Sequence, residues 1–254
     1  MTFYGTGPAG RLREDTPPQG YQDPDTGRVV RWGLTDFALA WFAGLVGALI
    51  GGSIALGFSS SDSISPTLSF LVVLPCQDGT SLAAVWWTSS SRGLGSWARD
   101  FGVRLFTKDL IWIFLGVALQ FVVGILTSLV TTLFHVSSDQ SVANDLDAMN
   151  GLGAIAAVVG VVFIAPFTEE ILYRGVLLRS LIRRMSDYAA IATSAGIFAL
   201  VHLLGDPGTA PLLPGLFVLG CVLGYMTVQT GNLSRAFAIH MGFNGVTALF
   251  LVLY

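Results

Sequence analysis

Charged residues are scarce in this chain: only 11% of its 254 residues are Asp, Glu, Lys or Arg, whereas 53% are hydrophobic. A soluble globular domain carries about a quarter charged residues, so the composition excludes that class. The apolar stretches are continuous and lack the alternation of polar and apolar residues that is typical of barrel strands. The sequence therefore predicts an all-α fold, a polytopic transmembrane helix bundle.

Cysteine, histidine and glutamate are also rare. The two cysteines, Cys76 and Cys221, lie inside apolar stretches, so they indicate neither a disulfide framework nor a metal motif. The chain has three histidines, and Glu14 is its only glutamate besides the adjacent pair Glu169 and Glu170. A charged side chain near the bilayer centre costs at least ~2.5 kcal/mol, so an ionisable residue inside a span indicates function.

The apolar stretches divide the chain into about seven spans, because a bilayer crossing takes roughly 20 residues. Residues 1–31 are rich in proline, glycine and charge, and we predict a disordered cytoplasmic tail there. Residues 32–109 hold the first two spans and a cytoplasmic loop, and residues 110–254 hold a core of five spans. We place the spans at about 34–58, 64–90, 110–133, 151–171, 188–204, 211–229 and 235–254.

The basic residues set the orientation of this arrangement. All thirteen Lys and Arg residues fall in the tail or in alternate connections, and the other connections carry aspartates but no Lys or Arg. Cytoplasmic loops carry an excess of Lys and Arg. We therefore predict a multi-pass protein of the cell membrane with a cytoplasmic N-terminus and a C-terminus on the opposite side.

Two spans contain features that bear on packing. Gly47 and Gly51 have the four-residue spacing that lets transmembrane helices approach closely. The second span contains Pro75 and Gly79 near its middle, which predicts that it is broken or displaced. Asp78, between them, could line a polar cavity.

Two adjacent carboxylates lie at the end of the fourth predicted span. On a helix Glu170 and Arg174 are four residues apart and share a face, so they can form an ion pair. Glu169 is rotated about 100° from that face and lacks this partner, which makes it the candidate general base. The alternative is that both acids cap a helix against the arginines that follow.

Two other spans carry polar side chains at helical spacing. Phe198 and His202 are four residues apart in the fifth span, where a lone histidine is more often a packing residue than a catalyst. His240 and Asn244 share one face of the seventh span. Glu, His, His and Asn are therefore expected to converge from three helices.

Such a cluster supports two kinds of chemistry. Glu169, His202 and His240 could hold one divalent metal such as zinc, with an open position for water. Without a cofactor, Glu169 could act as a base on a water held by His202, while His240 and Asn244 donate to the developing oxyanion. The residues alone leave both possibilities open.

The three blocks resemble the family of CAAX prenyl endopeptidases and bacteriocin-processing proteins, called CPBP or Abi. Its pattern is E-E-x-x-x-R, then F-x-x-x-H, then H-x-x-x-N or D, and this chain matches each block in order. The resemblance covers roughly residues 110–250 and implies an intramembrane endopeptidase. It leaves the need for a metal open, and we favour metal-free glutamate chemistry. It implies that the catalytic residues are Glu169, Glu170, His202, His240 and Asn244, supported by Arg174 and Phe198.

The same resemblance implies a peptide or membrane-protein substrate that is cleaved within the lipid bilayer. A prenylated peptide is the eukaryotic case, whereas the composition and tail are typical of a bacterial chain and favour a leader peptide, a bacteriocin precursor or a membrane-protein segment. No nucleic-acid signal is present. One alternative is a catalytically silent membrane scaffold or immunity-type peptide-binding protein. The other is a small transporter, which the lack of a visible inverted repeat disfavours.

Overall fold

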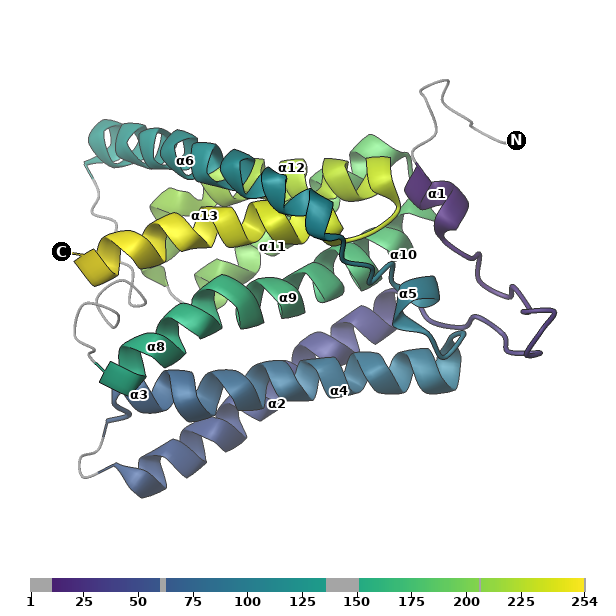
Figure 1. The fold of residues 1–254 in the computed structure, drawn as a ribbon, viewed down its shortest axis with the longest axis horizontal. Coiled ribbons are helices and arrows are strands. Elements are labelled where there is room, and N and C mark those ends of the chain that lie inside the picture. Colours follow the sequence, from purple (N-terminus) through teal and green to yellow (C-terminus); the bar gives the residue numbers. More distant parts are fainter. Residues whose placement is uncertain (1–10, 60–62, 136–150, 206, 254) are drawn as a thin grey trace.

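The fold is a bundle of long helices, seen in a computed structural model that describes residues 11–59, 63–135, 151–205 and 207–253 (Figure 1). These residues contain no strand, only an isolated bridge between Gln22 and Val29. Six of their helices are long and apolar enough to cross a bilayer, and α13, Ser234–Leu253, adds a seventh membrane-length helix. The predicted all-α bundle of about seven spans is confirmed.

The membrane-length helices consist of one or several regular segments each. The first is α2, Leu34–Phe58, and the second joins α3, Pro66–Leu68, η1, Ser69–Val73, and α4, Leu74–Arg92. The third joins η2, Thr107–Trp112, and α6, Ile113–Phe134. The fourth joins α8, Gly151–Val159, η3, Gly160–Ile164, α9, Ala165–Glu169, η4, Glu170–Leu178, and α10, Arg179–Ile182. The fifth is α11, Asp187–Gly205, and the sixth joins η5, Pro207–Leu212, and α12, Leu213–Thr230.

The long helix from α8 to α10 lies between two groups of helices (Figure 1). Helices α2 and α4 pack as a pair on one side of it, and α6, α11, α12 and α13 lie on the other. In the α2–α4 pair, a side chain at Gly47 would overlap the Cys76 carbonyl, and one at Gly51 would approach the Val73 backbone. The close approach that the glycine spacing predicts is therefore present.

Both transmembrane prolines that follow a π-helical turn are accommodated without a break. The helix through Pro75 is continuous from Pro66 to Arg92, so the predicted interruption of the second span is wrong. Proline lacks an N–H and crowds the carbonyl of the preceding turn. The wider π turns, η1 before Pro75 and η3 before Pro166, relieve that crowding.

The fourth helix is longer than the sequence predicts. It runs from Gly151 to Ile182 instead of ending near residue 171, so the glutamate pair lies inside it. Arg174 and Arg179, which the charge pattern places in a connection, are each 1% exposed. Arg179 is held by the Gly231 carbonyl at 2.6 Å and by the Thr16 hydroxyl at 3.1 Å. Partners from distant segments make burial of these arginines tolerable.

The N-terminal segment differs from the predicted disordered tail over residues 11–31. The short helix α1, Arg11–Asp15, places Leu12 in the core at 0% exposure. Arg13 donates to the Ile182 carbonyl and to the Asp187 carboxylate. A few arginine contacts and single buried side chains order this segment. The average composition of residues 11–31 cannot predict such specific contacts. Residues 1–10 lie outside the described residues.

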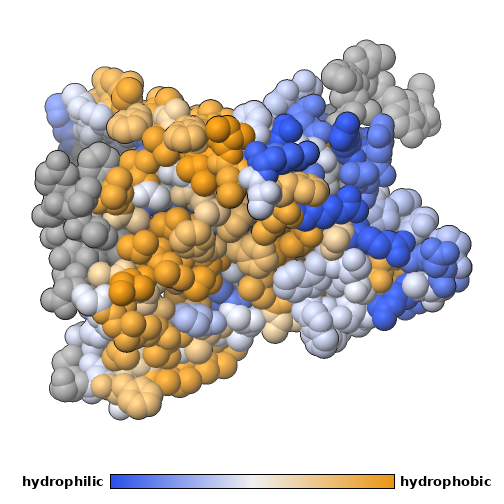
Figure 2. Space-filling model, viewed as in Figure 1, coloured by the Kyte–Doolittle hydropathy of each residue, from blue (hydrophilic) through white to orange (hydrophobic). Residues whose placement is uncertain are grey.

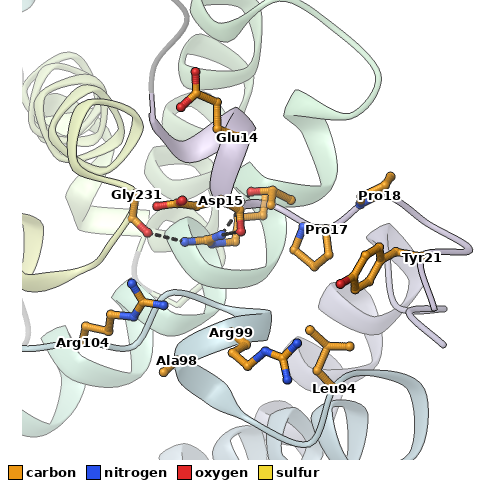
Figure 3. Close-up of a pocket in the computed structure, with 12 residues that line it drawn as sticks. Glu14, Asp15, Pro17, Pro18, Tyr21, Leu94, Ala98, Arg99, Arg104 and Gly231 are labelled. Carbon is orange, nitrogen blue, oxygen red and sulfur yellow. Dashed lines mark hydrogen bonds between the residues drawn. The ribbon is translucent and has the colours of Figure 1, made fainter. Parts of the chain in front are cut away.

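This segment and the connections form a polar end of the molecule. Figure 2 shows hydrophilic residues gathered where α1, α10 and α5, Trp97–Asp100, lie, and hydrophobic residues over most of the rest of this face. A pocket of about 340 Å³ at this end is lined by charges of both signs, including Glu14, Arg99 and Arg104 (Figure 3). The Arg99 guanidinium, 2.7 Å from Asp23, lowers the pKa of that carboxyl to about 2. Asp23 therefore stays ionised at physiological pH.

The sides of the bundle carry large exposed apolar side chains, such as Phe42 on α2 at 59% and Phe121 on α6 at 57%. Water would disfavour such a surface, whereas lipid chains cover it. Together with the apolar helices, these side chains identify a multi-pass membrane protein.

Helices α6 and α13 cross at two glycines, next to His240. A side chain at Gly116 would overlap the Ile239 carbonyl oxygen, and one at Gly242 would overlap the Ile113 carbonyl oxygen. We expect Gly116→Ala to lower the melting temperature in detergent, because overpacking costs about 1–3 kcal/mol. Gly124→Ala on the same helix is the control, since no atom lies within 4 Å of its new methyl group. Equal melting of the two variants would contradict the close crossing.

Candidate active site

Glu170 and Arg174 form a buried ion pair at the centre of the bundle. Arg174 Nη1 lies 3.0 Å from Glu170 Oε1, and each side chain is 1% exposed. Arg174 also donates to the Gly220 carbonyl of α12 at 3.4 Å. The ion pair predicted from the four-residue spacing is confirmed, and it fastens the carboxylate helix to α12.

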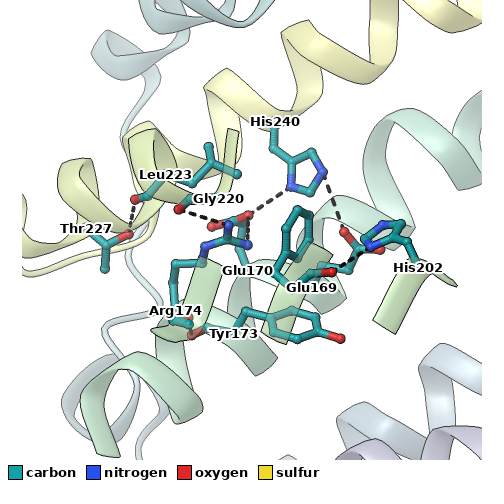
Figure 4. Close-up of polar contacts among 11 residues, drawn as sticks. Glu169, Glu170, Tyr173, Arg174, His202, Gly220, Leu223, Thr227 and His240 are labelled. Carbon is teal, nitrogen blue, oxygen red and sulfur yellow. Dashed lines mark hydrogen bonds and ion pairs between the residues drawn. The ribbon is translucent and has the colours of Figure 1, made fainter. Parts of the chain in front are cut away.

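His240 lies between the two glutamates (Figure 4). Its Nδ1 is 2.9 Å from Glu170 Oε1, and its Nε2 is 3.5 Å from Glu169 Oε2. A carboxylate paired with arginine is an acceptor, so Nδ1 carries a hydrogen and donates it to Glu170. Glu170 thereby fixes the ring plane and directs Nε2 towards Glu169.

The two glutamates differ sharply in exposure. The Glu169 side chain is 28% exposed, whereas that of Glu170 is 1% exposed. Among the described residues, Glu169 has no arginine or lysine partner, and its ion-pair contact is with His240 alone. The geometry therefore gives Glu170 a supporting position and leaves Glu169 accessible to small molecules.

Phe198 is the aromatic platform of the site. It is 1% exposed, and its ring centroid lies 4.4 Å from the Arg174 guanidinium carbon. The same ring makes edge contacts with His202 at 4.8 Å and with His240 at 5.9 Å. A cation over a desolvated aromatic face is stabilised by up to about 2 kcal/mol. Phe198 thus contacts both histidines and the arginine.

His202 is oriented by its own helix. Its Nδ1 lies 2.7 Å from the Phe198 carbonyl oxygen, so this nitrogen carries the hydrogen of the neutral ring. Nε2 is then left with a lone pair and can accept a hydrogen bond. The half-buried ring is therefore held ready to orient a polar group, such as water.

Asn244 has a partner that the motif does not predict. Its amide donates to the Val161 carbonyl at 2.8 Å. In the π-helical turn, Ala165 N–H bonds to the carbonyl five residues back, at Gly160, so the next residue would pair with Val161. That next residue is Pro166, which has no N–H. Asn244 therefore satisfies a carbonyl that the proline leaves free.

The arrangement of the site does not form a metal-ligand set. Within the described ranges, no group of three or more His, Cys, Asp or Glu side chains is placed to hold a metal ion. His240 directs both nitrogens at the glutamates, and His202 Nδ1 contacts its own helix. We therefore derive no step through a metal.

Comparison with known proteins gives a family match over part of the chain. A family model described as type II CAAX prenyl endopeptidase Rce1-like matches residues 150–246. Residues 150–246 are an Rce1-like region. The family resemblance of the three motif blocks is therefore confirmed. No curated protein and no solved structure gives a match.

The Rce1-like region contains all five predicted catalytic residues. It begins near the start of α8 and ends within α13, and helices α2 and α4 lie outside it. This match supports an intramembrane endopeptidase of the CAAX type in general, with a peptide substrate and a bilayer environment. Two contacts within the Rce1-like region were beyond sequence reasoning: Arg174 with the Gly220 carbonyl and Asn244 with the Val161 carbonyl. Backbone carbonyls leave no signal in a sequence.

Proposed function

We propose that this protein is an intramembrane endopeptidase in which Glu169 activates water without a metal. The observation that carries the proposal is the position of His240, which joins the buried Glu170–Arg174 pair to the accessible Glu169. A general base must be reachable by substrate and held in place, and this arrangement supplies both. The family match to residues 150–246 supports the same reaction class.

The proposed reaction begins with a water held between Glu169 and His202 Nε2. Glu169 takes a proton from the water as the oxygen attacks the carbonyl carbon of the scissile peptide bond. The tetrahedral intermediate then loses its amine, and Glu169 returns the proton to that nitrogen. The peptide bond breaks, and a carboxyl group and an amine are released.

The oxyanion of the intermediate requires hydrogen-bond donors. His240 Nε2 lies beside the Glu169 carboxylate, while Nδ1 is held by Glu170, and we assign to Nε2–H the role of donor to the oxyanion. Asn244 can contribute its amide only if it turns from the Val161 carbonyl when substrate binds. We therefore assign the first donor role to His240 and a conditional one to Asn244.

The proposed orientation places the polar end of the bundle in the cytoplasm, because it carries α1 and the arginine-rich connections. The substrate enters from the bilayer as an extended peptide. Leader peptides, bacteriocin precursors and membrane-protein segments are the substrates that we propose, ahead of a prenylated peptide.

The proposal is tested with purified protein in detergent and a library of apolar and leader-type peptides, read by mass spectrometry. We expect cleavage that is unchanged by a chelator such as EDTA or 1,10-phenanthroline. Loss of cleavage with chelator and its return with zinc would overturn the metal-free mechanism and keep the protease. Binding of peptides without cleavage by a folded, monodisperse protein would favour the silent scaffold.

A further inference from the structure

Asp78 on α4 is a buried carboxylate that the Rce1-like region does not include. It is 5% exposed, and its Oδ2 is buried without a hydrogen-bond partner among the described residues. Helix α4 packs against α9, the segment that ends at Glu169, and the Glu169 carboxylate acts on Asp78 electrostatically across that contact. A second acid thus faces the proposed general base from another helix.

The other buried polar side chains of α4 have different surroundings. Ser81 faces α2, where its hydroxyl occupies the space beside Gly44, and Ser89 donates to Asp100 at 2.7 Å. Among the other buried carboxylates, Asp36 pairs with Arg92. Asp78 has no basic side chain as a partner within the described chain. A buried, unpaired carboxylate is costly, so its position beside the site requires an explanation.

We propose that Asp78 completes the hydrolytic site from α4, as a second carboxylate that holds the attacking water together with Glu169. The inference rests on the proposed function for its chemistry. Two carboxylates confined in an apolar site retain one proton between them, because both cannot ionise without strong repulsion. The pair then offers one donor and one acceptor, which together fix the orientation of a water molecule.

In the proposed step, Asp78 holds the proton that the two carboxylates retain. The protonated Asp78 donates to the water oxygen, and the ionised Glu169 accepts a water hydrogen. When the water oxygen bonds to the peptide carbon, one water O–H bond breaks and its proton moves to Glu169. Asp78 keeps its own proton throughout, and Glu169 delivers the transferred proton to the leaving amine.

A melting-temperature cycle tests the carboxylate pair without any substrate. The variants are Asp78→Asn, Glu169→Gln and both together, in detergent at neutral pH. We expect the double variant to differ from the sum of the single shifts, because each substitution removes the same carboxylate interaction. Ser81→Ala combined with Glu169→Gln is the control and is expected to be additive. Additive shifts for Asp78 and Glu169 would overturn the inference.

Kinetics then test whether the pair serves hydrolysis. We expect Asp78→Asn to lower kcat on the order of 10²-fold while KM changes by less than about twofold, because the water and not the peptide is held by Asp78. Asp78→Ser is the second variant if the amide impairs folding. If the native chain cleaves peptides and Asp78→Asn leaves kcat unchanged, the role of Asp78 is wrong while the proposed function stands. A non-additive cycle in a chain that cleaves nothing would support the pair and overturn the proposed function.

Discussion

Glu169→Gln is expected to abolish peptide cleavage, with a loss of rate on the order of 10²- to 10⁴-fold. Glutamine keeps the shape of the side chain but cannot take a proton from water. The Glu169 side chain is 28% exposed, and its ion-pair contact with His240 is long, at 3.5 Å. Replacing the carboxylate by an amide therefore costs little stability. We therefore expect a melting temperature close to that of the native chain. Cleavage rate and thermal melting in the same detergent are the two measurements.

Glu14→Gln is the matched control for this experiment. It makes the same chemical change at the one glutamate outside the site, on α1. We expect it to retain the native rate of cleavage. If Glu169→Gln retained that rate as well, Glu169 would not be the base, and the mechanism proposed above would be wrong.

Arg174→Met is expected to cause a large loss of stability. The guanidinium is 1% exposed and is held by Glu170, the Gly220 carbonyl and the face of Phe198. Its removal leaves the Glu170 charge buried without a cation, which costs about 3–5 kcal/mol. The expected result is a large drop in melting temperature, or loss of the monodisperse peak in size-exclusion chromatography.

Two further variants separate the charge from the packing. Arg184→Met makes the same change on an exposed arginine whose guanidinium hydrogen-bonds to the Ser180 carbonyl and to Gln19, and it is expected to melt like the native chain. Combining Glu170→Gln with Arg174→Met removes both charges and should recover part of the lost stability. A double variant less stable than Arg174→Met would show that the ion pair is not the source of the effect.

Local sequence rules predicted much of this molecule. Hydropathy gave about seven spans, because each helix must present an apolar surface to lipid over its full length. The four-residue spacing of Glu170 and Arg174 predicted their ion pair, since both residues lie on one helix. The same helical geometry predicted that Glu169 lacks this arginine partner, whereas its greater exposure was not predicted.

What the sequence did not reveal depends on contacts between distant segments. The fourth helix continues through Arg179 because the Gly231 carbonyl, 52 residues away, accepts its hydrogen bond. His240 contacts both glutamates because α13 passes the carboxylate helix next to them. The spacing of residues along one helix does not predict where two helices meet. The order of residues 11–31 likewise depends on partners far along the chain, such as Asp187 for Arg13.

The contact between Asn244 and the Val161 carbonyl has a consequence for how this chain can vary in evolution. The carboxamide is needed there because Pro166 withholds the N–H that the π turn would otherwise supply. A descendant that replaced the proline would satisfy the carbonyl within its own helix, and selection on the carboxamide for structure would then relax. Pro166 and Asn244 are 78 positions apart in the sequence, yet they are expected to be gained and lost together.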